Sequence, residues 1–171
     1  MTETALLVPV PEASALVDPH RRRLTRAGAD GIPAHITLLY PFTDTALLKE
    51  ERVRQVAEIV GGEPAFDVSL ERTGRFELEP PILYLAPVPA APFAALTAAL
   101  VAAFPEHQPY AGVHPELVPH LTVAIADAAT LDAVEAEVAP SLPLAAQVSE
   151  AWLMERAGDG RWHRRERLPL G

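Results

Sequence analysis

The chain contains no cysteine, and its basic residues are few: 14 Lys and Arg stand against 23 Asp and Glu. The absence of cysteine excludes disulfide bonds, thiolate zinc sites and cysteine nucleophiles. The formal net charge of −9 argues against a protein that binds nucleic acid through an overall positive charge. We therefore expect no long duplex nucleic acid as a partner.

The sequence also has one long run without charge, because no charged residue occurs between Glu79 and Glu106. A run of this length is nominally a candidate for a membrane span. Pro87, Pro89 and Pro92 interrupt it and much of the remainder is alanine. A strand over Ile82–Ala86 followed by a helix over Ala91–Phe104 therefore fits better. The first ten residues lack the basic start of a secretory signal peptide. We expect a cytoplasmic protein without membrane association.

Strand-like and helix-like patterns alternate along the chain and predict an α+β protein. Segment 13–27 is helix-prone but contains Pro19, so a broken or short helix is expected there. Its basic cluster, which comprises Arg21, Arg22, Arg23 and Arg26, is interpreted as a solvated face. The other predicted elements are strands at Ala5–Val10, Ala34–Tyr40, Pro64–Phe76, Ile82–Ala86, Pro119–Ala126, Leu142–Arg156 and Arg161–Leu168, and helices at Leu47–Val60, Ala91–Phe104 and Thr130–Ala139.

The two halves of the chain show the same order of predicted elements. An apolar strand, a helix, a long strand, a tight turn and another strand follow one another over Ala34–Ala86 and again over Pro119–Leu168. In the second half the turn is Gly158-Asp159-Gly160, which is typical of a hairpin. The order indicates an internal duplication, and we expect residues 1–171 to form a single bilobal domain of two similar lobes.

The strand that opens each half carries the same short motif. It reads His35-Ile36-Thr37-Leu38 in the first half and His120-Leu121-Thr122-Val123 in the second. Side chains alternate across a strand, so His and Thr point to one face and the apolar residues point to the core. By composition alone a His-x-Thr pattern should occur about 0.35 times in this chain. Two copies on equivalent strands are therefore a stronger signal than a lone histidine, which is more often a satisfied core or surface residue.

Two histidines that face one another across a cleft suit acid–base chemistry. Because the unperturbed pKa of imidazole is about 6.5, one ring can be neutral and the other protonated near neutral pH. The neutral ring can take a proton from an attacking water, while the protonated ring donates to the leaving oxygen on the opposite side. An in-line displacement at a phosphodiester is the natural candidate, with the threonine hydroxyls holding phosphate oxygens.

A metal site is the main alternative for these histidines. Hydrolytic zinc usually has three protein ligands, commonly with a carboxylate among them. Neither motif places a carboxylate at ligand-like spacing from its histidine, although His107 and His114 lie upstream of His120 and could join a cluster. The expected site has no metal and no cofactor.

The paired motifs resemble the signature of the 2H phosphoesterase superfamily, which includes 2′-5′ RNA ligase-like proteins and RNA 2′,3′-cyclic phosphodiesterases. The resemblance implies two pseudo-symmetric antiparallel sheets with outer helices and a central cleft. It also implies metal-independent hydrolysis of 2′,3′-cyclic phosphates to 2′-phosphates, or 2′-5′ RNA ligation. Motif order makes His35 the acid and His120 the base, although pseudo-symmetry makes the roles interchangeable. Thr37 and Thr122 are then the groups that orient phosphate.

Substrate contacts are less well defined by the sequence. A nucleobase needs an aromatic platform, and Phe76, Tyr84 and Tyr110 are candidates because they lie near strand ends or in the loop before His120. Core packing or loop anchoring is the competing interpretation for each. The expected ligand is a small nucleotide or an RNA-end phosphate, bound by a monomer. A protein that binds such phosphates without turnover, or one with a structural role, is the alternative to an enzyme.

Overall fold

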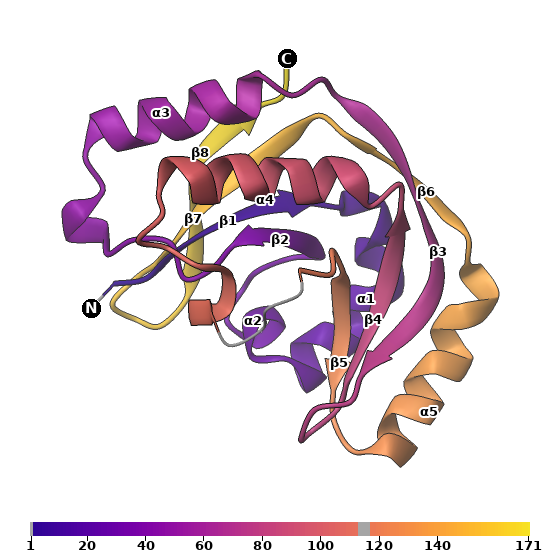
Figure 1. The fold of residues 1–171 in the computed structure, drawn as a ribbon. Coiled ribbons are helices and arrows are strands. Elements are labelled where there is room, and N and C mark those ends of the chain that lie inside the picture. The colour runs from indigo at the N-terminus through magenta and orange to yellow at the C-terminus, as the bar shows by residue number, and fades with distance from the viewer. Residues whose placement is uncertain (1, 113–116) are drawn as a thin grey trace.

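Two antiparallel sheets of four strands each form the framework of residues 2–112 and 117–171, the part of the chain that this computed structural model describes (Figure 1). The first sheet has the strand order β2-β1-β7-β8 and the second has the order β5-β4-β3-β6. The strands are β1 (Thr4–Pro9), β2 (His35–Leu39), β3 (Phe66–Phe76), β4 (Ile82–Val88), β5 (Leu121–Ile125), β6 (Leu144–Val148), β7 (Glu150–Arg156) and β8 (Trp162–Pro169).

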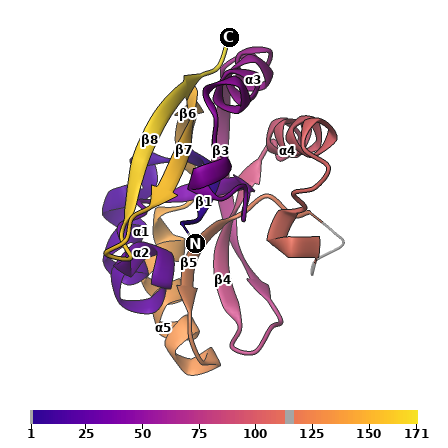
Figure 2. The same cartoon turned by 90° about the vertical axis from the view of Figure 1, so that its left-hand side faces the viewer.

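Helices surround the strands on the outside (Figure 2). They are α1 (Pro11–Leu24), α2 (Arg26–Ala29), α3 (Glu50–Gly61), α4 (Ala91–Ala103) and α5 (Ala128–Val138). Helix α1 follows a strand of the first sheet but packs on β5 and β6 of the second, whereas α4 follows a strand of the second sheet and packs on β2. The predicted α+β architecture with two antiparallel sheets and outer helices is confirmed.

Each sheet takes strands from both halves of the chain, which corrects the predicted boundaries of the repeat. The first sheet combines β1 and β2 with β7 and β8, and the second combines β3 and β4 with β5 and β6. The order strand–helix–strand–helix–strand begins at β1 and again at β4, not at Ala34 and Pro119. The motif strands β2 and β5 occupy corresponding places, because each is an edge strand of its sheet.

Two further predictions about elements are wrong. Pro19 lies inside α1, which continues through it because residues such as Ala13, Val17 and Arg21 are buried against the rest of the protein. Packing of that face offsets the missing backbone donor. The predicted strand Leu142–Arg156 is divided at Ser149: β6 pairs with β3 in one sheet and β7 with β1 in the other. The hairpin between β7 and β8 is confirmed, and Gly160 has the positive φ of 82° that favours glycine.

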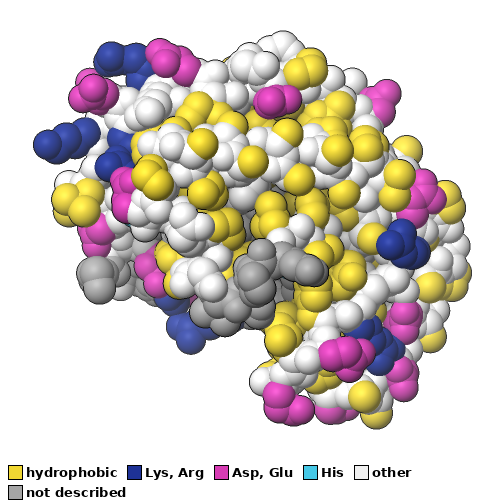
Figure 3. Space-filling view, in the orientation of Figure 1, with side chains coloured by type: hydrophobic (Ala, Val, Ile, Leu, Met, Phe, Trp, Pro, Cys, Tyr) yellow, Lys and Arg dark blue, Asp and Glu magenta, His cyan; other side chains and the backbone are white. Residues whose placement is uncertain are grey.

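The apolar core extends through both sheets and the inner faces of α1, α3, α4 and α5. On the face shown in Figure 3, apolar side chains gather toward the middle and charged side chains lie toward the periphery. None of the helices among the described residues has both the length and the apolar character needed to cross a lipid bilayer. The charge-free run after Glu79 forms β4 and α4, as predicted.

Candidate active site

The two motifs have the same pattern of burial on β2 and β5. Ile36 and Leu38 are buried in the core, as are Leu121 and Val123. The four His and Thr side chains, His35, Thr37, His120 and Thr122, are half-buried. The structure therefore agrees with the alternation predicted from the sequence, in which His and Thr share the face opposite the core.

Both histidines are held by the same backbone contact. Nδ1 of His35 lies 2.8 Å from the carbonyl oxygen of Pro33, and Nδ1 of His120 lies 2.6 Å from that of Val118. A carbonyl oxygen can only accept, so Nδ1 donates in both rings and the neutral rings leave Nε2 as a lone-pair nitrogen. Each Nε2 can thus accept a proton when the ring is neutral and return it when the ring is charged.

Arg21 contacts both motif strands from α1. Its Nε donates to the carbonyl oxygen of Thr122 at 3.1 Å, and its Nη1 donates to Ile32 at 2.7 Å and pairs with Asp18 at 3.0 Å. Its Nη2 lies 3.3 Å from Nδ1 of His35. The side chain is buried, which overturns the interpretation of this residue as part of a solvated face. The signal in the sequence was its spacing, because residues 13, 17 and 21 share one face of a helix.

The environment of His35 disfavours its positive form. Loss of hydration and the nearby Arg21 charge lower the pKa of His35 to about 3, against the opposing effect of the Pro33 carbonyl. The charge of His120 contributes in the same direction, so the two imidazoles lie within electrostatic range of each other. His35 is therefore neutral over the whole physiological range of pH.

The structure brings all three predicted aromatic candidates to His120. The ring centroids of Phe76, Tyr84 and Tyr110 lie 4.8, 5.7 and 6.3 Å from that of His120. Phe76 and Tyr84 stack on each other at 4.4 Å. Tyr84 lies opposite Thr122 on the neighbouring strand. The imidazole of His120 thus stands within an aromatic wall.

Tyr110 links the two motifs. Its ring stacks on His120, while its hydroxyl is hydrogen-bonded to Thr37. Its backbone N–H donates to the carbonyl oxygen of Tyr40 at 2.7 Å. Burial raises the pKa of Tyr110, so the hydroxyl stays neutral. Its φ of 50° is in the left-handed region, which is costly for a non-glycine residue. The contacts with His120, Thr37 and Tyr40 help to maintain this backbone conformation.

The part of the chain outside residues 1 and 113–116 contains no group of three or more His, Asp or Glu side chains placed to share an ion. His107 packs edge-on against Phe42 and contacts Arg52. His114 lies outside the described residues.

The comparisons with known proteins gave one matching family model and solved structures with a similar fold. The sequence model of the 2′-5′ RNA ligase superfamily matches residues 9–160. The fold is similar to that of Escherichia coli LigT complexed with 3′-AMP, with 19% identity over 99% of this chain and 98% of LigT and a TM-score of 0.66. The protein TT0787 of Thermus thermophilus is 20% identical over 98% of this chain and 97% of its own, with a TM-score of 0.65. Curated protein sequences gave no match.

Proposed function

Because the chain belongs to the 2′-5′ RNA ligase superfamily, whose chemistry is of the phosphoesterase or RNA-ligase type, we propose that it hydrolyses 2′,3′-cyclic phosphates of nucleotides or RNA ends to 2′-phosphates without a metal. The observation that carries the proposal is the matched pair of histidines. Each stands two residues before a threonine on an edge strand, and each has Nδ1 bound to a carbonyl so that Nε2 is the reactive nitrogen. Escherichia coli LigT, which shares the fold, has been crystallised with 3′-AMP, ATP and NADP⁺.

The contacts of Arg21 favour His35 as the base and His120 as the acid, the reverse of the assignment implied by motif order. A ring with a guanidinium beside it resists a resting positive charge. Nε2 of neutral His35 removes a proton from water, whose oxygen attacks phosphorus. The bond from phosphorus to the 3′ oxygen breaks in line, and His120 donates a proton to that oxygen. The products are a 2′-phosphate and a free 3′-hydroxyl.

The threonine hydroxyls have a supporting role in this reaction. Thr37 and Thr122 stand beside the histidines on the same face of their strands, where each can donate to a non-bridging phosphate oxygen. Such donors stabilise the charge that grows on phosphate in the transition state. The hydrogen bond between Tyr110 and Thr37 fixes the direction of one of these hydroxyls.

The first test is hydrolysis of a panel of 2′,3′-cyclic nucleotides in EDTA, followed by phosphorus NMR, which reports turnover and the position of the product phosphate. We expect His35→Ala and His120→Ala each to lower kcat by about 10²-fold or more. His163→Ala is the matched control, because His163 is exposed on β8. Full activity in either active-site variant would remove the acid–base proposal. Adding RNA with a 5′-hydroxyl to the same reaction tests ligation, in which that hydroxyl replaces water.

The pH dependence of kcat/KM tests the assignment of roles. The base must be neutral, and the pKa of His35 is lowered to about 3, so we expect no loss of activity from pH 7 down to about pH 5. A fall should occur on the alkaline side, where the acid loses its proton. An enzyme whose activity declines steadily above about pH 4 would contradict this assignment, since His35 would then be the group that must carry the proton.

A further inference from the structure

A pocket of about 280 Å³ opens beside His35 and Thr37 on the first sheet. Its apolar part is formed by Ala5, Leu7 and Ile32, and by the rings of Tyr40 and Trp162, whose centroids are 6.0 Å apart. Leu7 lies opposite Thr37 in the pairing of β1 with β2. The pocket therefore continues the same sheet face that carries the first motif. Nothing in the sequence pattern singled out these apolar residues.

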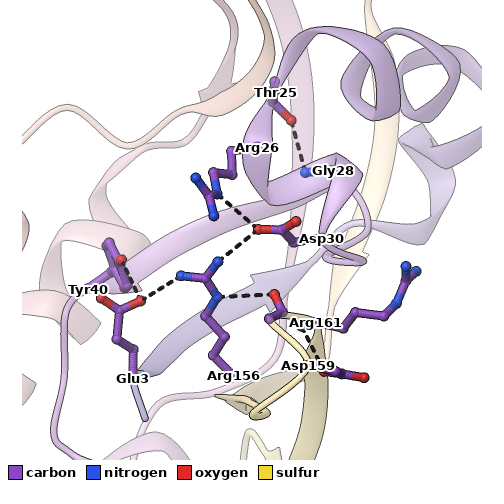
Figure 4. Close-up of polar contacts among 10 residues, drawn as sticks. Glu3, Thr25, Arg26, Gly28, Asp30, Tyr40, Arg156, Asp159 and Arg161 are labelled. Carbon is purple, nitrogen blue, oxygen red and sulfur yellow. Dashed lines mark hydrogen bonds and ion pairs between the residues drawn. The ribbon is translucent and has the colours of Figure 1, made fainter. Parts of the chain in front are cut away.

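The rim of the pocket is charged but balanced. Arg156 lies between Glu3 and Asp30 (Figure 4), with Nη2 3.3 Å from Asp30 and Nη1 3.6 Å from Glu3. Arg26 contacts the same Asp30 oxygen at 3.2 Å, and the Tyr40 hydroxyl donates to Glu3 at 3.2 Å. Two arginines thus face two carboxylates. A phosphate at this rim would gain little net attraction, because the positive and negative charges balance. A neutral polar group is better suited to the pocket.

The two carboxylates keep acceptor capacity for a ligand. Both arginine contacts to Asp30 are made to its Oδ2, and both contacts to Glu3 are made to its Oε2. Within residues 2–112 and 117–171, Asp30 Oδ1 and Glu3 Oε1 form no hydrogen bond. Each ionised oxygen can accept a donor such as an amino group.

We propose that this pocket holds the nucleobase of the substrate and prefers a base with an exocyclic amino group, such as adenine or cytosine, to uracil. This inference rests on the proposed function, because it places the base relative to a phosphate held between His35 and His120. A base is planar and apolar on its faces, which suits the walls formed by Tyr40 and Trp162. Its amino group would donate to Asp30 or Glu3, whereas uracil has the acceptor O4 at that position and can donate only through its ring N3–H.

The experiment compares kcat/KM for three substrates: 2′,3′-cyclic AMP, 2′,3′-cyclic UMP and glycerol 1,2-cyclic phosphate, which has no base. We expect the wild-type enzyme to favour cyclic AMP over cyclic UMP by about 10-fold or more. Trp162→Ala should lower kcat/KM for cyclic AMP about 10-fold more than for the substrate without a base. Asp30→Asn, which keeps the side-chain shape, should reduce the preference for adenine over uracil.

Trp152→Ala is the matched control, because Trp152 is a tryptophan of the neighbouring strand β7 that does not line the pocket. It should leave the ratio between the substrates unchanged. Trp162→Phe keeps an aromatic face and should recover most of the loss, which separates base binding from an effect on folding. If the ratios are the same in every variant while all three substrates are hydrolysed, the pocket proposal is wrong and the phosphodiesterase proposal stands.

If the wild-type protein hydrolyses no cyclic phosphate, the proposed function fails. The pocket is then tested by calorimetry of binding with the product-like probes 2′-AMP and 2′-UMP. A preference for 2′-AMP that Trp162→Ala abolishes would still support the pocket as a base site. Equal binding of the two probes, unchanged by the variant, would overturn it.

Discussion

The guanidinium of Arg21 and the imidazole of His35 are close enough to influence each other, with 3.3 Å between Nη2 and Nδ1. Because Nδ1 already donates to the carbonyl of Pro33, an N–H of Arg21 meets the N–H of the His35 ring. The positive charge of Arg21 therefore opposes a second positive charge on His35. Arg21 is itself stabilised by Asp18 and by the carbonyls of Ile32 and Thr122. A single buried arginine therefore contacts both motif strands and opposes protonation of His35, which is the state that the proposed role as a base requires to be avoided.

The depressed pKa of His35 should make the protein less stable in acid. In the unfolded chain His35 takes up a proton below about pH 6.5, whereas in the folded protein it does so only near a pH of about 3. Stability is therefore lost as pH falls from about 6.5 toward 3, by up to about 2 kcal/mol at pH 5. Urea unfolding at pH 7 and pH 5 should show a smaller loss for His35→Gln than for the wild type. His163→Gln is the control and should retain the wild-type loss; equal losses in all three proteins would contradict the prediction.

At the scale of elements, the pairing of β3 with β4 determines where the aromatic wall stands. Gly74 lies opposite Tyr84, and a Cβ at position 74 would come 2.5 Å from the Tyr84 ring. The ring lies over the glycine and from there contacts Phe76 and His120. A glycine in a strand interior often marks such a close approach.

Gly74→Ala should displace the Tyr84 ring and disturb His120. We expect a loss of about 1–3 kcal/mol of unfolding free energy, measured in urea, because the added methyl overpacks the site. A fall in kcat/KM for cyclic nucleotides should accompany it. Gly158→Ala is the control, since open space surrounds that position. If Gly74→Ala retains wild-type activity, the position of Tyr84 does not matter for the reaction.

Local patterns predicted most elements and the faces of both motif strands, because alternation along a strand depends only on its own residues. The burial of Ile36 and Leu121 beneath His35 and His120 follows directly from this rule. The break at Ser149 has no such local signal: the chain leaves one sheet and enters the other there because of partners distant in sequence. The pocket has the same origin, since Asp30, Tyr40 and Trp162 meet only after β8 joins the first sheet.

At the scale of the whole molecule, the two sheets are interlocked. The chain crosses from the first sheet to the second between β2 and β3, and returns between β6 and β7. Helices α1 and α4 each pack on the sheet that they do not directly follow, and Thr97 of α4 donates to the carbonyl of Leu38 at 2.8 Å. If either sheet unfolds, the helix that packs on it exposes its apolar face, and that helix directly follows a strand of the other sheet.

This interlocking predicts that the two sheets unfold together. Trp152 and Trp162 both lie on the first sheet, so their fluorescence reports on that sheet alone. A second protein carries Trp152→Phe, Trp162→Phe and Phe66→Trp, so that its only tryptophan lies on β3 of the other sheet. The ring of Phe66 packs against that of Phe93 on α4, with 5.2 Å between the centroids. In each protein the fluorescence transition in urea should coincide with that of circular dichroism, because crossing strands and exchanged helices couple the two cores. A fluorescence midpoint well separated from the circular dichroism midpoint in either protein would show that the two sheets unfold independently. The crossing strands and exchanged helices would then couple the two motif strands more weakly than this interlocking predicts.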